Sequence, residues 1–162
     1  MAESIKVGMA DLKVATKPDD VLITLGLGSC IGIALYDPTI KLGGLAHIML
    51  PDSTRIKNNS NIAKFADTGI AELYRLMIKG GASKMRMIAK IAGGARMFEM
   101  SGNNAMGAVG DNNAAASKEA LKKLGIRLVA EDTGLNYGRT VELHCDTGEY
   151  WIRSVGKPLK KI

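Results

Sequence analysis

The sequence predicts an α+β domain, and three observations lead to that class. Several short segments alternate apolar and polar residues with a period of two, as half-buried strands do. Two longer segments instead place apolar residues three and four positions apart, which is the spacing of a helix that buries one face. Glycine, proline, asparagine and aspartate separate these segments and mark turns. Many strands combined with two helices are typical of the α+β class.

The predicted strands are short, and some consist of an apolar run rather than an alternating pattern. Such a run is expected where both faces of a strand are buried. Glycines at 26 and 28 permit a sharp bend after one of these runs. Strands are expected at residues 5–9, 12–14, 21–25, 31–35, 42–50, 85–91, 126–131, 140–145 and 150–155.

Two helices are predicted from the spacing of apolar residues and from their end signals. The first covers residues 62–79, with Ser60 or Asn61 as its cap and a glycine directly after it. The second covers residues 114–124 and is also followed by a glycine. Residues 100–113 are rich in glycine and asparagine and are expected to form a loop.

Length and composition limit the class of protein. A chain of 162 residues is expected to form one domain with a closed hydrophobic core. Two cysteines are too few for a disulfide scaffold, and no zinc-ligand spacing or nucleotide-binding glycine motif occurs, so no cofactor and no metal are expected. No apolar run reaches the ~20 residues that cross a bilayer, and the N-terminus lacks a secretory signal. We therefore expect a cytoplasmic protein without membrane insertion.

The positive net charge does not by itself indicate a nucleic-acid partner. The chain carries 22 basic and 16 acidic residues, for a formal net charge of +6, and the basic residues are spread along it. Aromatic residues make up 4% of the chain, which is few for stacking bases, and no nucleic-acid-binding motif occurs. A solvated basic surface is expected, and no nucleic-acid partner.

Cys30 and His47 are the candidates for nucleophilic chemistry. Cys30 follows the glycine-bounded bend, where a thiol can be presented and backbone N–H groups left free. His47 is a polar interruption of an apolar strand. Cys145 shares a strand face with apolar residues and is expected in the core, whereas His144 on the opposite face is expected to be solvated.

A hairpin would bring the two candidates together. If residues 37–40 form its loop, Tyr36 faces Lys41 and Cys30 faces His47. Opposed residues have Cβ atoms ~4.5–5.5 Å apart, which suits an imidazole that takes a proton from a thiol. A slip of one residue would place the pair on opposite faces. On these residues alone, a catalytic dyad and a buried structural cysteine beside a hydrogen-bonded histidine both stay open.

Several sequence blocks, in a fixed order, carry a resemblance to a known family. The first two are TLGLGSC at residues 24–30 and GLAHIMLPDS at residues 44–53. The others lie at residues 90–95, 97–98, 130–134 and 138–139. Together they resemble the chemoreceptor glutamine deamidases called CheD, over nearly the whole chain. This implies a single deamidase domain at residues 1–156, followed by a basic C-terminal tail at residues 157–162.

The resemblance implies a fold and a set of site residues. The fold would be a β-sandwich flanked by helices, of the cysteine-hydrolase type and similar to a toxin domain that deamidates Rho-type GTPases. Cys30 would be the nucleophile, His47 the general base and acid, and Thr24 the residue that orients the imidazole. For the oxyanion of such a reaction, the candidate donors are backbone N–H groups near Ser29 and Cys30, with Gly28 as a supporting residue.

The resemblance also implies an activity and partners. The activity would be hydrolysis of glutamine side chains to glutamate on methyl-accepting chemotaxis receptors, through a cysteine thioester, together with hydrolysis of receptor methyl esters. The partners would be the cytoplasmic domains of chemoreceptors and the phosphatase CheC. The alternative is a regulatory binding protein that stimulates CheC, or is sequestered by it, with little hydrolysis.

Two positions depart from the family pattern. The family's Gly-x-Arg-Asn step is Gly-Asp-Asn-Asn at residues 110–113, without the arginine. The family's Asp-Thr-Gly-Gly-Asn has Leu135 in place of its second glycine. Both departures bear on loop details and substrate choice rather than on the reaction.

Overall fold

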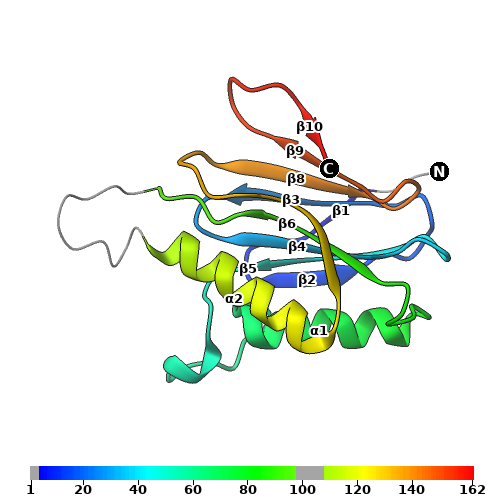
Figure 1. Cartoon of the computed structure of the whole chain (residues 1–162), viewed down its shortest axis with the longest axis horizontal. Helices are drawn as coiled ribbons and strands as arrows, with labels where there is room; N and C mark the ends of the chain where they lie inside the picture. The colour runs from blue at the N-terminus through cyan, green and yellow to red at the C-terminus, as the bar shows by residue number, and fades with distance from the viewer. Residues whose placement is uncertain (1–3, 98–107) are drawn as a thin grey trace.

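Two five-stranded sheets lie face to face, and two helices cover the free face of one of them (Figure 1). The computed structural model describes residues 4–97 and 108–162. One sheet packs against the helices on one face and against the second sheet on its opposite face, and we call it the central sheet. The second sheet is called the outer sheet. The predicted α+β class, with two sheets and two helices, is confirmed.

The elements have the following bounds. In spatial order, the outer sheet contains β1 (Ser4–Lys6), β3 (Val21–Leu27), β8 (Arg139–His144), β9 (Glu149–Arg153) and β10 (Lys160–Lys161). The central sheet contains β2 (Asp11–Val14), β5 (Leu42–Ile48), β4 (Ile31–Asp37), β6 (Ile88–Gly93) and β7 (Arg127–Thr133). The helices are α1 (Ala66–Lys79) and α2 (Ala108–Leu124), and the 3₁₀ turns are η1 (Ser53–Arg55) and η2 (Ile62–Lys64).

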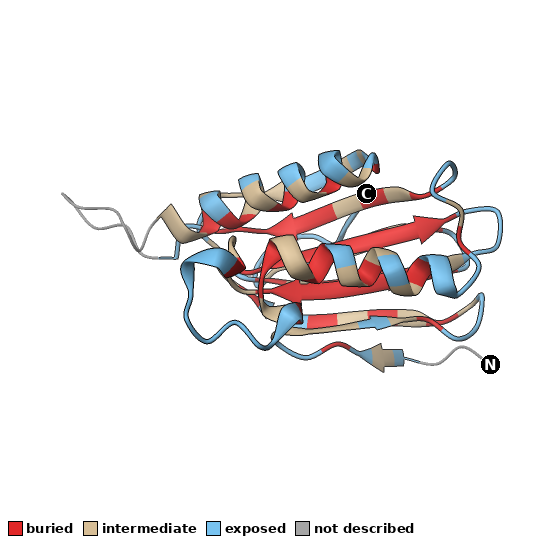
Figure 2. Cartoon of the chain, turned by 90° about the horizontal axis from the view of Figure 1, so that it is seen from below, coloured by how far each residue is buried: buried red, intermediate tan, exposed pale blue. Residues whose placement is uncertain are grey.

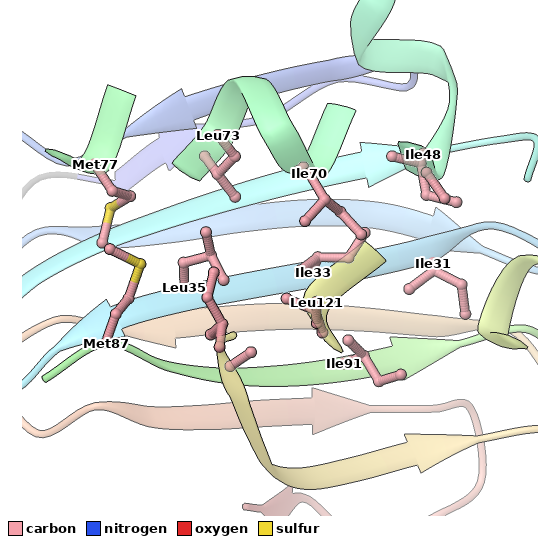
Figure 3. Close-up of a cluster of buried hydrophobic side chains, with 14 of the residues drawn as sticks. Ile31, Ile33, Leu35, Ile48, Ile70, Leu73, Met77, Met87, Ile91 and Leu121 are labelled. Atoms are coloured by element: carbon pink, nitrogen blue, oxygen red, sulfur yellow. The ribbon is translucent and has the colours of Figure 1, made fainter. Parts of the chain in front are cut away.

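Side chains of the central sheet alternate between two cores. In β4, Ile33 and Leu35 point to the helices and pack with residues such as Leu73 (Figure 3). Ala34 and Tyr36 belong to the second core, between the two sheets. Both faces of β4 are therefore covered and every residue of the strand is buried (Figure 2), which explains its nearly unbroken apolar sequence.

The first helix begins later than its apolar spacing predicts. Residues 62–64 form the separate turn η2, and Phe65 has an extended backbone before α1 starts. Asn61 is a cap as predicted, but of η2, where its side chain accepts from the Ala63 N–H at 3.1 Å. Phe65 leaves the helical conformation because its backbone forms a β-bridge with Leu50.

The second helix begins earlier than predicted, at residue 108 instead of 114. Residues 108–113 were expected in a loop and are helical, while residues 100–107 lie outside the described part of the chain. Glycine and asparagine have low helix propensity. Here a tertiary contact outweighs that propensity, because this end of the helix packs closely on the backbone after β6. A Cβ on Gly110 would lie 2.4 Å from the Ala95 carbonyl oxygen, so only glycine fits at this position.

The C-terminal residues join the outer sheet. β10 pairs with β9 in antiparallel fashion, and Ile162 exchanges two backbone hydrogen bonds with Tyr150, each of 3.0 Å. The Lys90 ammonium donates to the Ile162 carbonyl oxygen at 2.8 Å. Residues 157–162, which the sequence marks as a basic tail, thus include a short edge strand. No helix in the described ranges is long and apolar enough to span a membrane.

Leu73 lies fully buried between α1 and the central sheet. Leu73→Ala is expected to lower the free energy of unfolding by about 2–5 kcal/mol, because the lost methyl groups leave a cavity. Urea unfolding followed by circular dichroism measures the change. Ile78→Ala, at a partly exposed position of the same helix, should cost about 1 kcal/mol or less. Equal losses in the two variants would contradict this packing.

Candidate active site

Thr24 and His47 meet across the gap between the two sheets. Thr24 comes from β3 of the outer sheet and His47 from β5 of the central sheet, and both are buried. The Thr24 Oγ1 atom lies 2.7 Å from His47 Nδ1 and also donates to the Val7 carbonyl oxygen at 2.7 Å. The hydroxyl therefore connects both sheets and the chain between β1 and β2.

These two hydrogen bonds determine which nitrogen of His47 carries the proton. A hydroxyl has a single proton, and a carbonyl oxygen can only accept. Because the Thr24 proton goes to Val7, the hydroxyl must accept from His47, so Nδ1 is protonated. In the neutral ring Nε2 then has a free lone pair. Among the described residues this buried Nε2 atom has no hydrogen-bond partner, which leaves it able to take a proton.

The pairing of β4 with β5 differs by two residues from the predicted hairpin. His47 lies opposite Gly32 rather than opposite Cys30, so the predicted direct opposition is wrong. The turn occupies residues 38–41 and Asp37 still belongs to β4. Asp37 stays in the strand because its buried carboxylate is held there by Arg86, at 2.9 and 3.1 Å.

A shift of two residues leaves Cys30 on the same face as His47, because side chains alternate with a period of two. Cys30 belongs to the core between the sheets, and so do its neighbours on that face. It stands diagonally across from His47, an arrangement in which the two residues are ~7–8 Å apart and their Cβ atoms somewhat closer. Within the described ranges, no hydrogen bond joins the Cys30 thiol to the Nε2 atom of His47.

The backbone of Cys30 is held by the end of β6. The Gly94 N–H donates to the Cys30 carbonyl oxygen at 2.9 Å. Gly93 has φ +111°, and a Cβ there would lie 2.2 Å from the same oxygen. Only glycine permits this close approach. The Gly93-Gly94 pair, which in the sequence only marks the end of a strand, therefore also fixes the segment that carries the thiol.

Asn113 is a residue of the site that the sequence reasoning missed. Its buried side-chain amide donates to the carbonyl oxygens of Ser29 and Met49, each at 2.9 Å. Ser29 precedes Cys30, and Met49 follows closely after His47. One amide group thus links the two segments that carry the thiol and the imidazole. The signal in the sequence was that Asn113 corresponds to the Asn at the end of the family's Gly-x-Arg-Asn step. Its hydrogen-bond partners become evident only in the folded structure.

The N–H groups beside the thiol differ in their availability. The Gly28 N–H donates to the Gly26 carbonyl oxygen at 3.1 Å. Within the described ranges, the N–H groups of Ser29 and Cys30 donate to no other backbone carbonyl. These two donors are therefore the ones the segment can offer to a developing negative charge.

Burial keeps both reactive groups neutral at rest. Burial raises the pKa of the Cys30 thiol above its ordinary value of 9.0, although a hydrogen bond from its own backbone acts against this. Burial also lowers the pKa of His47 below its ordinary value of 6.5. Both shifts disfavour a thiolate–imidazolium pair, so near neutral pH the site holds a thiol and a neutral imidazole.

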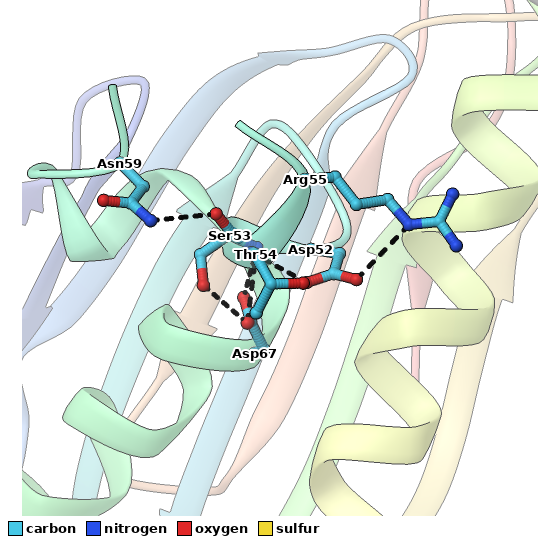
Figure 4. Close-up of polar contacts among 6 residues, drawn as sticks. All are labelled: Asp52, Ser53, Thr54, Arg55, Asn59 and Asp67. Carbon is cyan, nitrogen blue, oxygen red and sulfur yellow. Dashed lines mark hydrogen bonds and ion pairs between the residues drawn. The ribbon is translucent and has the colours of Figure 1, made fainter. Parts of the chain in front are cut away.

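The segment after β5 is held to α1 by polar contacts (Figure 4). Ser53 donates its N–H and hydroxyl to the Asp67 carboxylate, at 3.1 and 2.7 Å. Asp52 accepts from the N–H and hydroxyl of Thr54, at 2.9 and 2.6 Å, and Asn59 donates to the Ser53 carbonyl oxygen at 3.0 Å. The chain that leaves the His47 strand is therefore anchored.

The remaining cysteine and histidine lie apart from this constellation. Cys145 is fully buried, and burial raises the pKa of its thiol to about 12. His144 stacks on Trp151, with ring centroids 3.9 Å apart, and its Nε2 lies 3.0 Å from Glu142. Across residues 4–97 and 108–162, no three His, Cys, Asp or Glu side chains are grouped so that they could hold a metal ion.

With Cys30 and His47 as the reacting pair, Asn113→Ala is expected to lower the turnover number by about 10-fold or more, because small displacements of reacting groups are costly. The Michaelis constant should change little, since the side chain is buried away from any substrate. Steady-state kinetics separate the two constants. Asn112→Ala, at the neighbouring exposed position, is the matched control and should behave like the wild type. A change confined to the Michaelis constant would contradict the bridging role.

The neutral resting pair predicts a specific pH dependence. Because the thiolate is the reactive form, alkylation of Cys30 by iodoacetamide should rise with pH, with a midpoint above 9.0. Cys145→Ala serves as the background, so that one thiol is followed by mass spectrometry. A rate that is already constant below pH 7 would indicate a resting ion pair instead.

Comparisons with known proteins identify the family of the chain. A sequence profile described as "CheD chemotactic sensory transduction" matches residues 49–154. The "Probable chemoreceptor glutamine deamidase CheD" of Lachnoclostridium phytofermentans is 60% identical over 162 residues, which is 100% of both chains. A protein of the same name from Caldanaerobacter subterraneus subsp. tengcongensis is 53% identical over 98% of this chain and 97% of its own.

Among solved structures, the hypothetical protein YfiH of Bacillus licheniformis superposes with a TM-score of 0.51 and 16% identity. The match covers 78% of this chain and 51% of that one, and it shows similarity of fold alone. The profile match and the full-length relatives show that the chain belongs to the CheD family.

Proposed function

We propose that the protein is a chemoreceptor glutamine deamidase, which hydrolyses glutamine side chains of methyl-accepting chemotaxis receptors to glutamate. The observation that carries this proposal is the state of His47. Thr24 accepts the Nδ1 proton of His47, whose Nε2 atom has no hydrogen-bond partner in the described part of the chain, and His47 lies on the same sheet face as Cys30. The names of the full-length relatives supply the substrate class.

The first half of the reaction forms a thioester. His47 Nε2 takes the proton of the Cys30 thiol as the sulfur attacks the amide carbon of the glutamine. The amide oxygen gains the negative charge in the tetrahedral intermediate. His47 then donates its proton to the amide nitrogen, the C–N bond breaks, and ammonia leaves. Thr24 keeps accepting from Nδ1, so the ring retains its orientation while it is positively charged.

The second half releases glutamate. A water molecule gives a proton to His47 Nε2 and attacks the thioester carbon. The C–S bond breaks, and the sulfur recovers its proton from His47. The same acyl-enzyme accounts for the proposed hydrolysis of receptor methyl esters, since methanol would then be the leaving group instead of ammonia.

The oxyanion is proposed to be stabilised by the backbone N–H groups of Ser29 and Cys30. Each well-aimed donor of this kind contributes about 3–4 kcal/mol to the transition state. The Gly28 N–H is directed at Gly26, so Gly28 supports the bend rather than the oxyanion. Burial of the site strengthens these hydrogen bonds, because little water competes for them.

The remaining parts of the proposal concern location, partners and kinship. We place the protein in the cytoplasm, where receptor signalling domains are accessible, and include the phosphatase CheC as a second partner. We also infer that the sandwich is of the cysteine-hydrolase type found in the Rho-deamidating toxin domain. A regulatory role through CheC with little hydrolysis is the alternative, and the assay below separates it from the enzymatic role.

Cys30→Ala is expected to reduce conversion of receptor glutamine to glutamate to the uncatalysed background, because the nucleophile is lost. Purified receptor cytoplasmic fragments are incubated with the protein, and the converted residues are mapped by mass spectrometry. Cys145→Ala is the matched control and should retain the wild-type rate. If the wild-type protein converts no receptor glutamine, the enzymatic role fails. Binding to CheC without conversion would then favour the regulatory role.

A further inference from the structure

Three exposed apolar residues belong to backbone segments next to the candidate active site. Leu25, Met97 and Leu135 are 55%, 46% and 61% exposed. Leu25 follows Thr24 directly and lies where the pairing of β3 with β8 is irregular. The Met97 side chain covers Gly28, since its Cγ lies 3.1 Å from the position of a Gly28 Cβ. We call these three residues the apolar rim.

One backbone segment, from Gly94 to Arg96, separates Leu135 from Cys30. Its carbonyl oxygen accepts from the Arg96 N–H at 2.8 Å, and the Gly94 N–H donates to the Cys30 carbonyl oxygen at 2.9 Å. The chain from Gly94 to Arg96 therefore lies between the two, as a strand would. Neighbouring strands are ~4.8 Å apart, which puts the Leu135 backbone about 10 Å from that of Cys30.

The conformation of Leu135 is unusual. Its φ is +60°, in the left-handed region that glycine adopts readily and that leucine adopts only with strain. Its side chain is mostly exposed and belongs to neither hydrophobic core of the described residues. Stability of the fold therefore gives no reason for a leucine at this position. Strained residues of this kind concentrate at functional sites.

The proposed reaction determines which part of the substrate comes near the apolar rim. A glutamine side chain is short, so the substrate backbone must come to the mouth of the site before the amide carbon reaches the Cys30 sulfur. We take the receptor segment that carries the glutamine to be helical as part of this proposal; residues three and four positions away then lie ~5–6 Å from the glutamine, and two turns span ~11 Å. Residues within two turns of the target glutamine thus reach the distance of Leu135.

We propose that Leu135 is a specificity-determining residue that, together with Met97, binds an apolar side chain of the receptor within two helical turns of the target glutamine. This inference rests on the proposed function for the identity of the substrate. The strained backbone holds the leucine out toward the substrate, where burial against an apolar partner contributes to binding. The residue acts on substrate affinity and takes no part in bond making or breaking.

Two substitutions test the proposal. Leu135→Gly removes the side chain and relieves the strained φ, so the melting temperature should stay equal or rise. Leu135→Asn keeps a residue that tolerates the left-handed region but is polar. In both variants the Michaelis constant for a receptor cytoplasmic fragment should rise about 10-fold, with the turnover number and the rate of Cys30 alkylation unchanged.

Lys41→Gly is the matched control. Lys41 also has a positive φ, of +53°, and is exposed, but it lies in the turn between β4 and β5, at the opposite end of these strands from Cys30. This variant relieves the same kind of strain and should leave both kinetic constants at their wild-type values. A lower affinity in the Leu135 variants combined with undiminished stability cannot come from misfolding.

The outcomes also separate this inference from the proposed function. Binding of the receptor fragment is measured in a Cys30→Ala background, so that affinity is obtained without turnover. Conversion by the wild type with unchanged constants in both Leu135 variants overturns the inference and leaves the deamidase function in place. About 10-fold weaker binding in the Leu135 variants, without conversion by the wild type, supports the contact and overturns the function. Absence of both binding and conversion overturns both.

Discussion

The hydrogen bond between Thr24 and His47 is the interaction on which the proposed chemistry of this protein depends. It is formed between the two sheets, so it exists only when the sandwich has closed. The second bond of the hydroxyl, to Val7, fixes the direction of the first and with it the tautomer of the ring. By forming both bonds, Thr24 holds the His47 ring with Nδ1 protonated. In the described residues this leaves Nε2 without a hydrogen-bond partner, as the proposed base requires.

The central sheet explains why this arrangement is rigid. Both of its faces are covered, one by the helices and one by the outer sheet, and β4 is buried along its whole length. A slip of one residue would move apolar residues from one core to the other, so the register is strongly determined. That register places His47 opposite Gly32 and keeps Cys30 on the same face.

Burial has two opposing effects on the site. It keeps the thiol protonated and the imidazole neutral, which makes the resting protein less reactive toward small electrophiles than a thiolate would be. It also strengthens every hydrogen bond that forms when a substrate amide enters. In the proposed reaction, charge separation is thus delayed until the substrate is bound. Asn113 supports this arrangement from the helix side by holding both reactive segments at once.

The sequence by itself indicated the two helices and most of the strands, because apolar periodicity and glycine positions are local properties, but it missed the edge strand β10 and the separate turn η2. It singled out Cys30 and His47 from the few residues capable of the chemistry, while the role of Thr24 came from family resemblance. Only the tertiary structure decided the register of the hairpin, since the ion pair of Arg86 with the buried Asp37 keeps Asp37 in the strand, which moves the turn by one residue and changes the pairing by two. It also decided the helical state of residues 108–113 and the bridge made by Asn113. These features depend on contacts between residues that are far apart in the chain, and such contacts cannot be predicted from a local sequence pattern.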